Sequence, residues 1–193
     1  MLKKYNMHIF IAIVAVLTAY DLLNWDGISI VRKLVNLFAV LGVLHEIEEK
    51  YWPGGFHKLM LKKFEINADD FDVESANFAV FVFWMVYLAL GYIFDNMVFF
   101  FLMTIVLSIF EAFIHTAGIK IHNLNKPYTP GMVTAWLMAI AAIYSAIRLN
   151  GIAAPIDYLI AIVLFVVSFA ILASRIWSSA GITRKDMLEK IMQ

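Results

Sequence analysis

The most restrictive feature of this sequence is a series of apolar segments that are each long enough to cross a bilayer. A membrane-spanning helix needs about 20 mostly apolar residues, and lipid offers the backbone no hydrogen-bond partners, so such segments fold as helices or as closed barrels. The segments fall at residues 7–24, 34–52, 76–94, 97–117, 131–149 and 156–174. The pattern predicts an all-α protein, a six-helix transmembrane bundle over residues 1–175 with a short cytoplasmic tail helix at 176–193.

Composition supports a membrane protein and excludes several function classes. Hydrophobic residues make up 63% of the 193 residues and charged residues only 16%, whereas soluble domains carry about 25% charged residues. The net charge of zero offers no basic surface to nucleic acid. Cysteine is absent, which excludes thiolate metal sites and cysteine nucleophiles. The expected partners are membrane lipid and a hydrophobic small-molecule substrate, and a homodimer is compatible with the sequence.

The distribution of lysine and arginine predicts the orientation of the bundle, because short cytoplasmic loops retain basic residues. If the N-terminus lies in the cytoplasm, only Arg32, Lys33 and Arg148 of the fifteen basic residues fall on the outer side. We therefore expect both termini in the cytoplasm.

Two segments between the spans allow more than one interpretation. Residues 54–64 alternate apolar and basic side chains, which is typical either of an amphipathic helix on the inner membrane surface or of an ordinary loop. The acidic residues from Asp69 to Glu74 lack the spacing and glycine of an EF-hand. They are better explained as capping residues at the start of the third span.

Ionisable residues interrupt two of the apolar segments, and they are the best indication of function. The second span ends in His-Glu-Ile-Glu-Glu at residues 45–49, and the fourth contains Glu-Ala-Phe-Ile-His at residues 111–115. A charged group at bilayer depth costs roughly 2.5–3.5 kcal/mol even on lenient scales, so such groups usually mark a buried functional site. Both spans run toward the cytoplasm in the predicted topology, so the two clusters lie at the same depth.

Helical spacing selects the side chains that share a face. His45 lies beside Glu48 and Glu49, whereas Glu46 points elsewhere. Glu111 and His115 are one turn apart, and His122 joins them if the helix continues to Asn125. The candidate metal ligands are therefore His45, Glu48, Glu49, Glu111, His115 and His122. Glu49 and Glu111 are the candidate catalytic carboxylates, and Ser108 and Asn123 are candidate supporting residues.

This residue set favours a divalent metal, zinc or iron, with enough ligands for one ion or two. The metal would activate water or dioxygen for hydrolysis or oxidation of a lipid-like substrate. Three alternatives stay open: a metal-free acid/base isomerase, a small proton-coupled transporter, and a structural polar core. Glu48 and Glu49 could also be a solvated helix end, His122 a surface histidine, and Glu111 with His115 a buried ion pair.

The motif residues also resemble a known family. His45 to Glu49, followed by Tyr51-Trp52-Pro53-Gly54-Gly55-Phe56, is similar to the family of small bacterial integral membrane proteins named for its HXXEE motif. Further matching positions are Asn77, the segment from Glu111 to His115, and Pro130-Gly131-Met132-Val133-Thr134-Ala135. The resemblance covers residues 36–145 and implies a bacterial integral membrane protein and a supporting role for Asn77. With six α-helical spans, we expect this protein in the inner membrane. The resemblance implies no reaction, because the family's function is unknown.

Overall fold

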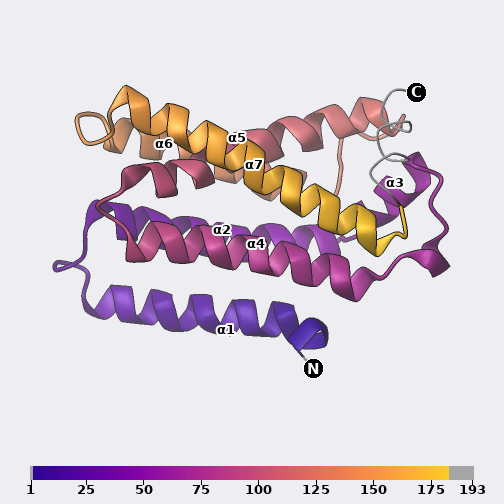
Figure 1. Ribbon diagram of the computed structural model, residues 1–193, viewed down its shortest axis with the longest axis horizontal. Helices are drawn as coiled ribbons and strands as arrows, with labels where there is room; N and C mark the ends of the chain where they lie inside the picture. Colours follow the sequence, from indigo (N-terminus) through magenta and orange to yellow (C-terminus); the bar gives the residue numbers. More distant parts are fainter. Residues whose placement is uncertain (1, 183–193) are drawn as a thin grey trace.

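The computed structural model describes residues 2–182, and this part of the chain folds into helices joined by short loops, without a strand (Figure 1). The elements are α1 (Leu2–Leu23), α2 (Ile30–Lys50), α3 (Phe56–Lys63), a 3₁₀ turn (Ala68–Asp70), α4 (Val73–Ile93), α5 (Val98–Ile121), α6 (Met132–Arg148) and α7 (Pro155–Ser179). The prediction of an all-α fold is confirmed, and each of the six predicted segments corresponds to one long helix.

The helix boundaries follow local chemistry more than apolar length. Ser29 caps α2 by accepting a hydrogen bond from the Arg32 backbone N–H, at 3.2 Å, so the helix starts before the apolar window. Asp72 caps α4 by accepting from the Ser75 backbone N–H at 3.0 Å, which confirms that the acidic segment includes a helix cap. The α5 helix ends at Ile121, and Asn123 then adopts a positive φ of 51°.

The helices pack as a bundle around one apolar core. The α1 helix packs against α2 and α4, and α5 packs against α4, α6 and α7, while α2 also contacts α6 (Figure 1). Large aromatic side chains fill the interior, among them Phe10, Phe38, Tyr87 and Phe101, which are almost fully buried. Gly42 lets α2 approach α4 closely, because a Cβ there would lie 3.0–3.2 Å from the ring of Trp84.

Four of the described helices, α1, α4, α5 and α7, are long and apolar enough to cross a membrane. The α2 helix carries charged residues at both ends, and α6 is an apolar helix of only 17 residues. Length and composition thus indicate a membrane protein. The crossing of α2 and α6, and the side on which each end lies, stay predictions.

One end of the bundle collects the segments that carry the predicted ligands. The C-terminal ends of α2 and α5, the N-terminal end of α6 and the short helix α3 lie toward this end (Figure 1). The segment at residues 54–64 does contain a helix, α3, although its contact with a membrane surface is untested. The α7 helix continues to Ser179, and most of the predicted tail helix lies outside the described residues.

Candidate metal centre

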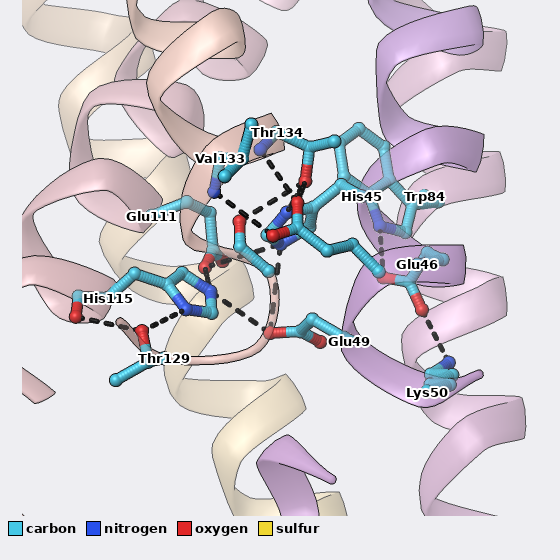
Figure 2. A network of polar contacts seen from close by, with 12 residues as sticks. His45, Glu46, Glu49, Lys50, Trp84, Glu111, His115, Thr129, Val133 and Thr134 are labelled. Carbon is cyan, nitrogen blue, oxygen red and sulfur yellow. Dashed lines mark hydrogen bonds and ion pairs between the residues drawn. The ribbon is translucent and has the colours of Figure 1, made fainter. Parts of the chain in front are cut away.

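Two helices bring four of the predicted ligands together. His45 and Glu49 come from successive turns of α2, and Glu111 and His115 from successive turns of α5. One potential ligand atom from each residue lies within 4.8 Å of all the others. The Nε2 atom of His115 is 3.0 Å from Glu49 Oε1 and 3.6 Å from Glu111 Oε2, and the Nε2 atom of His45 is 3.7 and 3.9 Å from the same two oxygens (Figure 2). We call these four residues the His/Glu cluster.

The size of the His/Glu cluster suits a single ion. A tetrahedral zinc ion with ligands at about 2.0–2.1 Å separates its ligand atoms by about 3.3–3.4 Å. The four nitrogen-to-oxygen distances lie between 3.0 and 3.9 Å, and all four ligand atoms lie within 4.8 Å of one another, so the side chains would have to draw together to bind one ion. Two imidazoles with two carboxylates also match the donor preferences of iron and related divalent metals.

Two threonines hold the imidazoles with Nε2 facing the cluster. The Nδ1 atom of His115 is 3.1 Å from Thr129 Oγ1, and that hydroxyl donates its hydrogen to the His115 carbonyl at 2.9 Å (Figure 2). Because the hydroxyl hydrogen is used elsewhere, Thr129 must accept from Nδ1–H. His45 Nδ1 is likewise 3.1 Å from Thr134 Oγ1. Thr134 donates to the Glu48 carboxylate at 2.5 Å, so it too accepts from the ring. A neutral imidazole that donates from Nδ1 has an unprotonated Nε2, the state that binds a metal.

Burial differs between the two kinds of ligand. The side chains of His45 and His115 are 3% and 0% exposed, whereas those of Glu49 and Glu111 are 15% and 20% exposed. Among the described residues, His115 Nε2 has no hydrogen-bond partner of acceptable geometry despite its contact with Glu49. A buried ring nitrogen without a hydrogen bond is costly and needs an explanation, and a ligand at the centre of the cluster would supply one. The carboxylates form the accessible side.

Gly131 allows the α5–α6 loop to pass close to the cluster. It has a φ of 93°, and a Cβ built on it would lie 2.6 Å from Glu49 Cγ and 2.7 Å from His115 Cε1. Glycine is therefore required here twice, once for the backbone conformation and once for space.

The short helix α3 covers the cluster from the end of the bundle. The ring of Phe56 lies 4.7 Å from that of His115, centre to centre. The next residue, His57, interacts electrostatically with Glu49. Burial lowers the pKa of His57, and the negative charge of Glu49 opposes this effect. The α3 helix and the α5–α6 loop thus enclose the histidines and leave the carboxylates partly open.

Glu48 lies apart from the His/Glu cluster. Its Oε1 atom accepts hydrogen bonds from the Tyr128 hydroxyl at 2.8 Å and the Val133 backbone N–H at 3.1 Å, and its Oε2 atom accepts from the Thr134 backbone N–H at 2.8 Å and hydroxyl at 2.5 Å. The N-cap residue of α6, Gly131, makes no side-chain cap. Glu48 therefore caps α6 from another helix, at the end where a negative charge is favoured.

The remaining sequence-predicted residues lie outside the cluster. His122 follows the last residue of α5. Burial and the positive charge of Lys63 lower the pKa of His122. Ser108 is buried on α5, one turn before Ala112, and its hydroxyl donates to the Thr104 carbonyl. The structure gives Asn77 and Asn123 no hydrogen bond to the cluster residues. Glu46, which was expected to point elsewhere, bonds to Trp84 and Lys50.

Sequence reasoning gave no role to Thr129, Gly131 and Thr134, and Tyr128 was not identified at all. The one usable signal was the Pro130-Gly131 step directly before a helix. A helix that starts after glycine without a Ser, Thr, Asp or Asn cap needs an acceptor from elsewhere in the chain, and a nearby glutamate is a natural candidate.

Comparison with known proteins gives one match. Residues 36–146, more than half of the chain, match a family described as "Protein of unknown function with HXXEE motif". No curated protein and no solved structure matches the chain.

Proposed function

The chain belongs to the family of proteins of unknown function with an HXXEE motif, and we propose that it is an integral membrane enzyme that depends on one divalent metal ion. The proposed ligands are His45 and Glu49 from the motif, with Glu111 and His115 from α5. Zinc and iron suit these donors best.

One observation carries the proposal. Both histidines direct Nε2 at the two carboxylates, because Thr129 and Thr134 accept from their Nδ1–H groups. Metal-binding histidines in proteins are typically held in this way by a hydrogen bond from the second ring nitrogen. A structural ion pair has no need of two such orienting contacts.

The chemistry of the centre follows from its ligands. A divalent ion held there supplies Lewis-acid activation of water or dioxygen. Glu49 and Glu111 stand on the accessible side, and each carboxylate has a second oxygen that can accept a proton from a reacting group. This arrangement is compatible with both hydrolysis and oxidation.

A cavity near the cluster supports a small hydrophobic or lipid-like substrate. It is an open depression of about 390 Å³ between the α2–α3 and α5–α6 loops. Leu59, Tyr128 and Pro130 are among its lining residues, and its surface is mainly apolar. Pro130 directly precedes Gly131, which contacts the cluster side chains, so the cavity and the centre share one wall.

The proposed setting is the bacterial inner membrane, with all six long helices as spans and both termini in the cytoplasm. The charges of α2 are compatible with this arrangement because they have partners: Glu46 pairs with Lys50 at 2.5 Å, and Arg32 with Asp95 at 3.2 Å. The centre would then lie at the cytoplasmic leaflet, where an amphiphile can reach it from the membrane.

Metal analysis tests the proposal directly. We expect protein purified in mild detergent, from cells grown with added iron and zinc, to contain close to one metal ion per chain by mass spectrometry. His115→Ala and Glu111→Gln should each lower the metal affinity about 10-fold or more. His122→Ala is the matched control, since this histidine lies outside the cluster, and it should retain the metal.

A metal-free acid/base pair is the competing function, because His115 and Glu49 lie 3.0 Å apart. In that case wild-type protein contains no metal. His115→Ala or Glu111→Gln would then act mainly on stability, by about 3 kcal/mol for a buried charge left without its partner. Thermal denaturation of the same preparations in detergent separates the two results.

A further inference from the structure

The two adjacent glutamates of the motif, Glu48 and Glu49, have different surroundings. Glu49 is a proposed metal ligand, and Glu48 has another role. All four hydrogen bonds of Glu48 come from the α5–α6 loop and the start of α6, and they occupy both of its carboxylate oxygens. Glu49 instead points at the histidines. Glu48 is thus committed to donors of its own and is not available to the metal.

We propose that Glu48 is a positioning residue that keeps His45 in its metal-binding tautomer, acting through Thr134. This inference rests on the proposed metal centre, but it concerns a residue that does not touch the ion. The contacts form a chain from Glu48 Oε2 to Thr134 Oγ1, 2.5 Å, and from Thr134 Oγ1 to His45 Nδ1, 3.1 Å.

The direction of each hydrogen bond in this chain follows from the carboxylate. An ionised carboxylate can only accept, and Glu48 Oε2 lies closer to the Thr134 hydroxyl, at 2.5 Å, than the Gly131 carbonyl does, at 3.2 Å, so the single hydroxyl hydrogen points to Glu48. The hydroxyl oxygen then accepts from His45, which places a ring hydrogen on Nδ1 and, in the neutral ring, leaves Nε2 free. The Thr134 backbone N–H also binds Oε2, at 2.8 Å, and holds the carboxylate in place.

Glu48→Gln would reverse this chain with little change in shape. The glutamine amide carries one acceptor oxygen and one donor nitrogen, and it faces donors at both positions. When its nitrogen faces Thr134, it donates to the hydroxyl, and the hydroxyl hydrogen turns away from residue 48. Its two remaining acceptors are His45 Nδ1 at 3.1 Å and the Gly131 carbonyl at 3.2 Å. When the hydroxyl donates to His45 Nδ1, the neutral ring carries its hydrogen on Nε2, the atom that has to bind the metal.

Histidine NMR of metal-free protein in detergent tests the tautomer without any dependence on metal. At a pH where the ¹⁵N shifts show a neutral ring, ¹⁵N-labelled wild-type protein should show His45 protonated on Nδ1, with the signal assigned by its loss in His45→Gln. The Nε2–H form should gain in Glu48→Gln. An unchanged His45 tautomer in that variant would overturn the inference, even if the protein proves to bind metal.

Metal affinity provides the second readout. Glu48→Gln and Thr134→Val should each weaken zinc binding about 10-fold or more, whereas Thr134→Ser keeps the hydroxyl and should restore it. Cobalt-loaded Glu48→Gln at saturation should keep the visible spectrum of wild type, because no ligand is lost; a spectrum like that of Glu49→Gln would make Glu48 a ligand and overturn the inference.

Tyr128→Phe separates positioning from general loosening of the α6 start. It removes another hydroxyl from Glu48, 2.8 Å from Oε1, but leaves the path to His45 intact. We expect it to retain zinc affinity and the Nδ1–H tautomer. Equal losses in Tyr128→Phe and Thr134→Val would contradict the inference. Absence of metal from wild type with the expected tautomer change would instead contradict only the metal-dependent function.

Discussion

Three glutamates within four residues of α2 have three different surroundings. Glu46 pairs with Lys50 and Trp84, Glu48 caps α6, and Glu49 meets the histidines. Their directions around the helix account for the difference, since successive residues point about 100° apart. A cluster of like charges in sequence is therefore not a cluster in space, and each carboxylate has its own compensating partners.

Gly131→Ala should damage the centre without removing a ligand. The added methyl would lie 2.6 Å from Glu49 Cγ and 2.7 Å from His115 Cε1, so the loop or the ligands must move. Because the ligand geometry of a metal site must hold within a few tenths of an ångström, we expect a loss of metal affinity of about 10-fold or more, measured by competition with a chelator.

Gly151→Ala is the control for the backbone conformation. Gly151 has a φ of 85°, close to that of Gly131, and nothing in the described residues lies within 4 Å of its added Cβ. Both variants place alanine in the left-handed backbone region, which lowers the free energy of unfolding by about 1–2 kcal/mol in each. If both bind metal as wild type does, the close approach of Gly131 to the ligands has no bearing on the centre.

At the scale of helices, apolar length and i,i+4 spacing were sufficient to predict the main features. They indicated the six long helices and the pairs His45–Glu49 and Glu111–His115, because both patterns depend only on local geometry. The family was also recognised from its motif residues, which the match over residues 36–146 confirms.

Tertiary contacts account for what the sequence could not predict. Glu48 shares a helical face with His45, yet it turns to the uncapped start of α6, an element that is 80 residues or more away in sequence. His122 was placed on the α5 face only if the helix continued, and the helix ends at Ile121. The roles of Thr129 and Thr134 depend on how the α5–α6 loop folds back, which no periodicity encodes.

Glu46→Gln should affect the contact between α2 and α4 and spare the metal. The carboxylate is 3% exposed, accepts from Trp84 Nε1 at 2.8 Å and pairs with Lys50 at 2.5 Å. The amide leaves the lysine charge without its partner, at a cost of up to about 3 kcal/mol in unfolding free energy. Denaturation in detergent measures this loss, and metal analysis should find the affinity unchanged.

A double variant shows whether the lost charge pairing is responsible. Replacing Lys50 with methionine in the Glu46→Gln background removes the unpaired charge, and stability should recover, since apolar replacement of a buried ion pair is often neutral. No recovery would mean that the unpaired lysine charge is not the cause of the loss. A loss of metal in the single variant would mean that Glu46 is coupled to the centre.

At the scale of the whole molecule, polar groups gather at both ends of the bundle and apolar side chains lie between them. The His/Glu cluster, α3 and the α5–α6 loop occupy one end (Figure 1). At the other end Ser29 and Arg32 at the start of α2 bond to Asp95 in the α4–α5 loop. This separation matches a bilayer with two aqueous faces, and it assigns the centre to the face that holds most of the lysines.

The proposed topology can be measured with single cysteines, because the chain has no cysteine of its own. Lys58→Cys on α3 and Asn150→Cys in the α6–α7 loop lie toward opposite ends of the bundle (Figure 1). The excess of basic residues at the α3 end predicts that this end faces the cytoplasm. In intact cells, a membrane-impermeant thiol reagent added from outside should therefore label position 150 and leave position 58 unlabelled until the cells are opened. Labelling of position 58 alone in intact cells would place the centre at the outer leaflet. Labelling of both positions would mean that α6 does not cross the membrane, because α4, α5 and α6 separate the two positions.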